Sequence, residues 1–172
     1  MNEYLNFVES LAQEGGTDQI FFNSGPNHAA IVFATMFKYA TQEVRMYCGG
    51  FTGEVSNDKR YQRELEAYLE RGGRLRILVE NDHSANPQSQ IYAILRKYSS
   101  LVQVYLAQGR VTDKNGDPLH FAMADHRMYR LETGTTDYTA EVNFNNPGKV
   151  DILNDYFEQI LTTSIHHPVT LN

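Results

Sequence analysis

The residues of this chain that could do chemistry gather in the stretch from Leu119 to Pro147, LHFAMADHRMYRLETGTTDYTAEVNFNNP. Histidine can act as a nucleophile or proton carrier, and a carboxylate can orient its ring. Arginine and asparagine can hold an anionic or polar ligand. The candidate catalytic residues are His120, Glu141 and Asn143, and the candidate ligand contacts are Arg130, Glu132, Asn145 and, earlier in the chain, Ser24.

His120 lies in a segment that alternates as a β-strand does. Phe121 and Met123 share one face, whereas His120, Ala122 and Ala124 share the other. The two alanines leave room beside the imidazole for a ligand or for closely packed backbone. His120 is therefore either a pocket residue or a partly buried, hydrogen-bonded histidine.

Two further pairs share strand faces. Glu141 and Asn143 are two residues apart, so we expect them on one side of a third strand. If that strand pairs near His120, Glu141 could orient the imidazole and Asn143 could bind a polar ligand; otherwise both belong to a polar solvent face. Arg130 and Glu132 also share a face and either form a cross-strand ion pair or contact a ligand.

Ser24 belongs to the segment Asn23-Ser24-Gly25-Pro26, which precedes a long apolar run. Asn23 or Ser24 could cap a helix there, and Pro26 suits its first position. The same backbone N–H groups could instead face an anion. The spacing of histidines and carboxylates indicates no zinc site, and we expect no metal or cofactor.

The rest of the chain supplies the elements that must position these residues. A first helix is expected from Asn2 to Gln13, a buried strand at Ile20–Phe22 and a buried helix from Ala29 to Ala40. Asn86-Pro87 should open a later helix, and a final helix should run from about Lys149 to Leu161. Further strands are predicted at 44–48, 75–79 and 102–106, a further helix around 61–69, and a hairpin that turns near Asp125-His126.

Strands that alternate with helices predict an α/β fold, with a mixed sheet flanked by helices on both faces. The late strands lack intervening helices, so we expect that end of the sheet to be antiparallel. The length of 172 residues fits a single domain, 1–172, with an N-terminal helix in 1–16 and a loosely held tail in 162–172.

Composition narrows the function classes. The net charge of −6 argues against a broad nucleic-acid surface, although it leaves room for a small basic pocket. Cys48 is the only cysteine, so no internal disulfide can form. We see neither a signal peptide nor a membrane span, and we expect a cytoplasmic protein without a membrane partner.

The order of elements, with the joint Glu-Arg-Gly-Gly-Arg-Leu-Arg-Ile-Leu-Val-Glu at 70–80 and the histidine-bearing strand after it, resembles one half of the phospholipase D-like superfamily. The resemblance covers roughly 17–161. In that family a His-x-Lys-x4-Asp motif and a later Gly-Ser-x-Asn carry phosphodiester chemistry. The histidine attacks phosphorus, and a second histidine protonates the leaving group. Single-half members build the site across a homodimer, so the resemblance implies a homodimer and a phosphate-containing ligand.

The motif is degenerate in this chain. With His120 on the family histidine, Ala122 takes the lysine position and Arg127 the aspartate position. With Asp125 on the aspartate, Pro118 takes the histidine position and His120 the lysine position. The later motif becomes Ala-Glu-Val-Asn at 140–143 and keeps only its asparagine.

Three hypotheses follow. The first is a degenerate phospholipase D-like domain that binds a ligand or partner without catalysis. The second is a divergent phosphodiesterase or nuclease, with His120 as nucleophile and Arg130 in place of the lysine, in a homodimeric site. The third is an unrelated α/β interaction module, which would be favoured if 119–124 and 138–143 lay on separate sheet edges.

Overall fold

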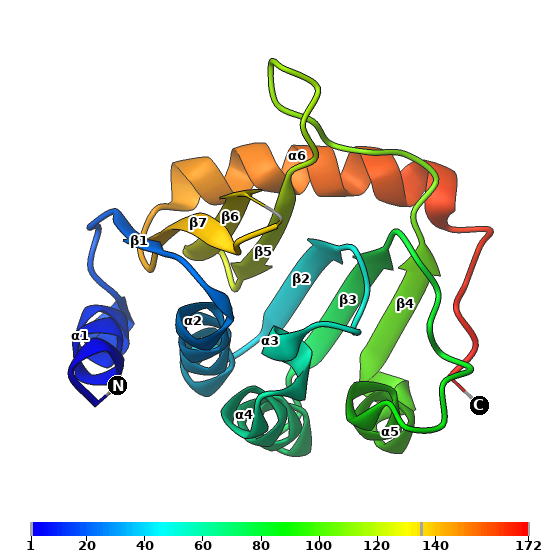
Figure 1. Cartoon of the computed structure of the whole chain (residues 1–172), viewed down its shortest axis with the longest axis horizontal. Coiled ribbons are helices and arrows are strands. Elements are labelled where there is room, and N and C mark those ends of the chain that lie inside the picture. Colours follow the sequence, from blue (N-terminus) through cyan, green and yellow to red (C-terminus); the bar gives the residue numbers. More distant parts are fainter. Residues whose placement is uncertain (1, 135, 172) are drawn as a thin grey trace.

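The computed structural model describes residues 2–134 and 136–171 and contains a seven-stranded sheet in the order β1-β7-β6-β5-β2-β3-β4 (Figure 1). The strands are β1 (Phe21–Asn23), β2 (Glu43–Cys48), β3 (Arg74–Val79), β4 (Val102–Leu106), β5 (His120–Ala124), β6 (Met128–Gly134) and β7 (Thr139–Asn143). The helices are α1 (Asn2–Ala12), α2 (Pro26–Tyr39), α3 (Glu54–Asn57), α4 (Lys59–Glu70), α5 (Gln90–Lys97) and α6 (Pro147–Ser164), with short 3₁₀ turns η1 (Gln13–Gly15) and η2 (Ser99–Leu101).

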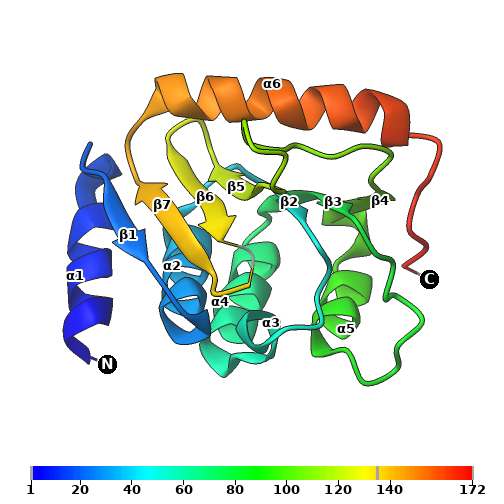
Figure 2. The same cartoon turned by 45° about the horizontal axis from the view of Figure 1, so that its top comes forward.

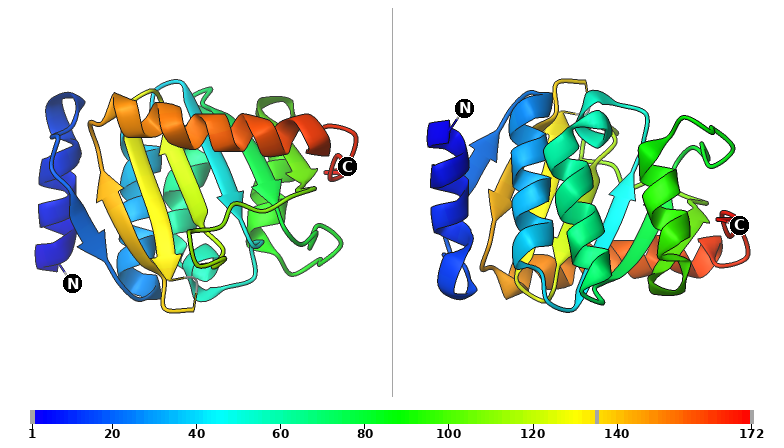
Figure 3. Two further views of the ribbon diagram at one scale, coloured as in Figure 1. Left: turned by 90° about the horizontal axis from the view of Figure 1, so that it is seen from above. Right: turned by 90° about the horizontal axis from the view of Figure 1, so that it is seen from below.

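Helices cover both faces of the sheet, as the sequence predicts. α2, α4 and α5 lie on one face, while α6 crosses the other (Figure 2). α1 packs beside α2 next to the edge strand β1 (Figure 3). Along residues 2–134 and 136–171, every helix is too short or too polar to serve as a bilayer span.

The sheet is mixed. β2, β3 and β4 are parallel, whereas β5, β6, β7 and β1 join by antiparallel pairing. The antiparallel end agrees with the absence of helices between the late strands. Because of these directions, the ends of β2, β3 and β6 meet the starts of β5 and β7 at one edge of the sheet. The carboxyl ends of parallel strands are the usual place for a ligand in such folds.

The alternation predicted around His120 is confirmed by the packing of β5. Phe121 and Met123 belong to the core under α6, whereas Ala122 and Ala124 belong to the core on the side of α2. The hairpin turns at Asp125, which takes a left-handed φ of 54°. Aspartate tolerates that conformation better than most residues, so this turn can begin directly after β5.

Some local predictions are wrong. Ile20 and Phe22 are not buried; they are 52% and 64% exposed. Ile20 precedes β1, and within β1 only Phe21 and Asn23 are buried. Gly25, without a side-chain cap, precedes α2, although Pro26 does take the first position. The helix expected after Asn86-Pro87 begins at Gln90, where the Ser89 hydroxyl accepts a hydrogen bond from the Tyr92 N–H.

The tail is held more firmly than expected. The N–H of Leu106 donates to His167, and the N–H of Val169 donates to Val104, so the tail pairs with the edge of β4. Val169 and Leu171 are buried. α6 also runs longer at both ends than the sequence predicts. Asn172, the last residue of the predicted loose tail, lies outside the described residues.

Candidate functional site

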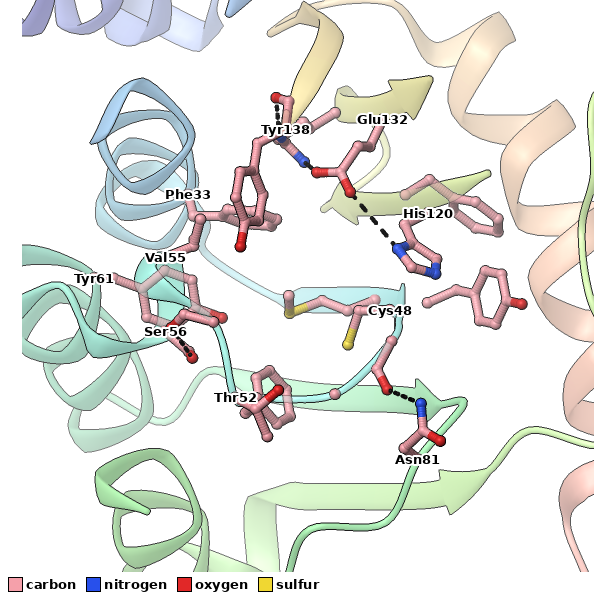
Figure 4. A pocket seen from close by; sticks show the side chains of 18 of the residues that line it. Phe33, Cys48, Thr52, Val55, Ser56, Tyr61, Asn81, His120, Glu132 and Tyr138 are labelled. Carbon is pink, nitrogen blue, oxygen red and sulfur yellow. Dashed lines mark hydrogen bonds and ion pairs between the residues drawn. The ribbon is translucent and has the colours of Figure 1, made fainter. Parts of the chain in front are cut away.

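A pocket of about 330 Å³ lies at the sheet edge where β2 ends and β5 begins. Its floor is the sheet, and its walls come from α2, the loop after β2, α3 and the turn between β6 and β7 (Figure 4). The volume is at the lower end of the range for small-molecule sites. The pocket holds His120, Arg130 and Glu132, three of the candidate residues.

His120 is held between two carboxylates. Its Nδ1 lies 3.6 Å from Oε1 of Glu132, and its Nε2 lies 3.6 Å from Oε1 of Glu80. The imidazole and the Tyr47 ring form a T-shaped pair, with centroids 5.6 Å apart. Nε2 is buried and makes no hydrogen bond with the described residues. Glu80 also accepts a hydrogen bond of 2.7 Å from the Tyr47 hydroxyl, which fixes the carboxylate that faces Nε2.

Arg130 is the centre of a buried network. Its Nη1 donates to Glu132 at 2.8 Å, its Nε to Asn23 at 3.2 Å and its Nη2 to the carbonyl of Tyr138 at 2.9 Å. The guanidinium lies over the ring of Phe33, 4.9 Å from the centroid. Arg130 and Glu132 are only 2% and 6% exposed. They form a buried ion pair within one strand, whereas the sequence had suggested a cross-strand ion pair.

The electrostatics of this pair follow from burial and proximity. Burial alone would raise the pKa of Glu132, but the contact with His120 and the charge of Arg130 outweigh it and hold that pKa below 4.5. Burial lowers the pKa of Arg130, and the carboxylate of Glu132 offsets part of that effect. Burial also raises the pKa of the Cys48 thiol in the pocket wall to about 12.

Tyr138 forms the wall opposite His120. Its ring descends from the turn between β6 and β7 beside Phe33 (Figure 4). Its φ of 59° is left-handed, which is unusual for an aromatic residue. The carbonyl of Tyr138 accepts hydrogen bonds from both Arg130 and Asn23, and these bonds stabilise the turn. A methyl group at Gly53 would come within 2.8 Å of the Tyr138 hydroxyl oxygen, so glycine allows this close contact.

Glu141 and Asn143 are on the other face of the sheet. Leu131 pairs with Glu141 and Tyr129 with Asn143, and both partners pack under α6. The carboxylate of Glu141 accepts a 2.5 Å hydrogen bond from the Tyr129 hydroxyl. The expectation that Glu141 orients His120 is therefore wrong. Glu132, the cross-strand partner of His120, takes that place.

Three other predicted or aligned residues also lie outside the pocket. The amide of Asn143 donates to Asp18 at 2.8 Å, and Asn145 bonds to Asn143 and Gly16 at the opposite sheet edge. Ser24 is exposed and does not line the pocket. Asp125, the aspartate of the second motif alignment, accepts hydrogen bonds from the N–H groups of residues 41–43 at the edge away from the pocket.

Three polar residues of the site are absent from the candidates that the sequence suggests. Asn23 is a cap candidate in the sequence, although its alternation with Phe22 places it on the inward side with Phe21. Glu80 directly follows β3, and its place at the carboxyl end of a parallel strand was the available signal. Tyr138 carried no comparable signal. Within the described residues, no group of His, Cys, Asp and Glu side chains is arranged to hold a metal ion.

Solved structures with the same architecture identify the fold. NucT from Helicobacter pylori superposes with a TM-score of 0.63 at 18% identity, over 85% of this chain and 97% of that one. Nuc from Salmonella typhimurium, a phospholipase D family member, gives 0.57 at 14% identity over the same shares. The fold is phospholipase D-like. At these identities the likeness concerns the fold alone.

A third similar structure is TrmBL2, an archaeal chromatin protein with a novel mode of DNA binding. Its TM-score is 0.66 at 14% identity, and the match covers 98% of this chain but only 61% of TrmBL2. No family model matches the sequence, and no curated protein matches it either. β5 and β7 lie in one sheet and flank β6, so the separate sheet edges that would have favoured an unrelated module are not found.

Proposed function

We propose that this chain is a non-catalytic ligand-binding domain of phospholipase D-like fold, with its binding site in the pocket beside His120. The observation that carries the proposal is the orientation of His120. Since Glu132 faces Nδ1, a nucleophilic histidine would have to present Nε2 to phosphorus. Nε2 is instead buried and faces Glu80, which does not line the pocket.

The cation of the pocket supports the same proposal. Among the described pocket-lining residues, Arg130 is the only lysine or arginine. Transfer of a phosphoryl group needs positive charge directed at its oxygens. The nitrogens of Arg130 already donate to Glu132, Asn23 and Tyr138, so the guanidinium is a poor replacement for the lysine of the motif.

One observation favours the second candidate, a divergent phosphodiesterase. A carboxylate beside Nδ1 is the arrangement that orients a histidine nucleophile or base, and Glu132 supplies it. The second histidine would have to come from a second copy of the chain. A homodimer is therefore part of this candidate, and sedimentation velocity at increasing protein concentration tests it. A protein that stays monomeric throughout contradicts the shared site.

Turnover assays separate the two candidates. The full chain is incubated with bis-(p-nitrophenyl) phosphate and with single-stranded DNA, beside a His120→Ala variant. We expect either no product or equal traces in both proteins, as a contaminating enzyme would give. Turnover that disappears in His120→Ala but persists in a matched His126→Ala variant would establish the phosphodiesterase. His126 is the control because its ring is exposed at the β5–β6 turn.

DNA binding is the property named for TrmBL2, and a separate binding assay tests it for this chain. The net charge of −6 and the neutralised Arg130 argue against it for this chain. We expect no shift of labelled single- or double-stranded DNA in a gel at low salt. A shift that weakens steeply as salt rises would show a phosphate-binding surface.

A further inference from the structure

The charges that line the pocket cancel. Arg130 and Glu132 form an ion pair at 2.8 Å, and His83, Asn81, Thr52 and Ser56 complete the polar part of the wall. Glu80, just behind His120, adds negative charge on that side. An anion that entered the pocket would lose its hydration and would meet the carboxylate of Glu132 together with the guanidinium of Arg130. Without a net positive charge, nothing offsets its desolvation.

The remaining wall suits an uncharged molecule. Phe33, Phe51, Tyr61 and Tyr138 present aromatic surface, and hydroxyl and amide groups stand among them. Small-molecule sites combine apolar walls with a few polar groups in this way. Arg130 contributes by holding the Tyr138 carbonyl, which keeps the Tyr138 ring over the pocket. Its role is to position Tyr138, and it is not directed at the ligand.

We propose that the pocket admits a small, uncharged, hydrogen-bonding molecule and discriminates against phosphate esters and other anions. The inference rests on the proposed ligand-binding function and names its ligand class. It departs from the phosphate-containing ligand that the resemblance implies. The alternative is an anion site centred on Arg130, and the labelling of Cys48 distinguishes the two.

Cys48 reports on the pocket directly, because it lines the wall and is the only cysteine. Iodoacetamide is uncharged and iodoacetate is anionic, and both alkylate a thiolate with loss of iodide. Each rate is measured by intact mass for the folded protein and for the chain unfolded in guanidinium chloride. The unfolded chain gives the intrinsic ratio of the two rates, so the high pKa of the thiol affects both reagents alike.

We expect folding to slow the alkylation of Cys48 by iodoacetate about tenfold more than its alkylation by iodoacetamide. This factor corresponds to about 1.4 kcal/mol. Two controls exclude the overall charge as the cause. The discrimination should persist at high salt, which screens exposed charges. It should also be absent in a Cys48→Ser, Gln103→Cys variant, whose thiol is on the exposed side of β4 with the same net charge.

Three results would decide against the inference. Equal slowing of both reagents means that the pocket does not select by charge. Faster relative labelling by iodoacetate means an anion site. Absence of labelling by either reagent before unfolding, at exposure times long enough to allow for the small thiolate fraction that a pKa of about 12 leaves, means that the pocket admits no small molecule. Because none of these results requires turnover, they are separable from failure of the non-catalytic proposal, which the phosphodiester assay detects.

A pocket variant sharpens the measurement. Thr52→Lys adds a cation at an exposed position of the wall, and we expect it to increase labelling by iodoacetate selectively. Gln103→Lys adds the same charge on β4, away from the pocket, and should leave the ratio unchanged. If both variants changed the ratio equally, the discrimination would come from the overall charge and the inference would fail.

Discussion

His120 and Glu132 are cross-strand partners on β5 and β6, and Nδ1 of the imidazole lies 3.6 Å from Oε1 of the carboxylate. The same carboxylate pairs with Arg130 through its other oxygen. Glu132 thus links the only histidine of β5 to the buried guanidinium. Because these groups are buried together, the stability of the fold depends on the ionised state of Glu132.

Replacement of Glu132 by glutamine should destabilise the protein strongly. The change leaves Arg130 charged and buried without its partner, and removal of one member of a buried pair costs about 3 kcal/mol or more. Urea unfolding followed by circular dichroism measures the loss. Glu64→Gln is the control, since it removes a more exposed pair with Arg63 and should cost no more than about 1 kcal/mol. Equal losses would show that the Arg130–Glu132 pair contributes no more than a surface pair.

The contribution of Glu132 should depend on pH with a definite sign. Its pKa in the folded protein lies below the ordinary value of 4.5, so the ionised carboxylate stabilises the fold above that pH. This stabilisation is lost as the pH falls through the folded pKa. The difference in free energy of unfolding between the wild type and Glu132→Gln should therefore be constant near neutrality and narrow below pH 4.5. A difference that widened in acid would contradict the assignment.

Asp125 should prove structural although one motif alignment places it on the family aspartate. Its carboxylate accepts hydrogen bonds from the N–H groups of Thr41, Gln42 and Glu43. Asp125→Ala removes these bonds and puts alanine in a left-handed conformation, at a cost of about 3 kcal/mol. Asp125→Asn keeps an acceptor and tolerates the conformation, so about half that loss is expected. Unfolding curves of both variants test this, and equal losses would mean that only the charge matters.

The sequence was sufficient to predict which residues share a face within one strand. The alternation around His120 and the common face of Arg130 and Glu132 are both present in the structure. It was not sufficient to relate one strand to the next. His120 meets Glu132 because the β5–β6 turn occupies residues 125–127; a change of one residue would have shifted the register and reversed the faces.

The choice between Glu132 and Glu141 also depends on an irregularity of the backbone. Next to the turn, Gly134 pairs with Thr139, and the register then shifts between Gly134 and Glu132. On the side of the shift away from the turn, Glu132 pairs with Ala140 and Leu131 pairs with Glu141. Glu141 therefore faces α6. Such a bulge depends on tertiary packing and on the left-handed Tyr138, which Arg130 and Asn23 hold. Residue types and spacing alone do not specify it.

The contact between Gly53 and Tyr138 should be detectable by a double-mutant cycle. Gly53 has an ordinary φ of −91°, so Gly53→Ala introduces no backbone strain; its methyl group would instead displace the Tyr138 hydroxyl. We expect a loss of about 1 kcal/mol and faster alkylation of Cys48 by iodoacetamide, because the ring no longer covers the pocket. In a Tyr138→Phe background the same substitution should cost less, since the hydroxyl is gone.

Gly109→Ala, where the added methyl meets open space, is the matched control and should leave the labelling rate unchanged. If Gly53→Ala had the same cost with and without the Tyr138 hydroxyl, the two residues would not be coupled, and Tyr138 would not depend on Gly53 for its place over the pocket.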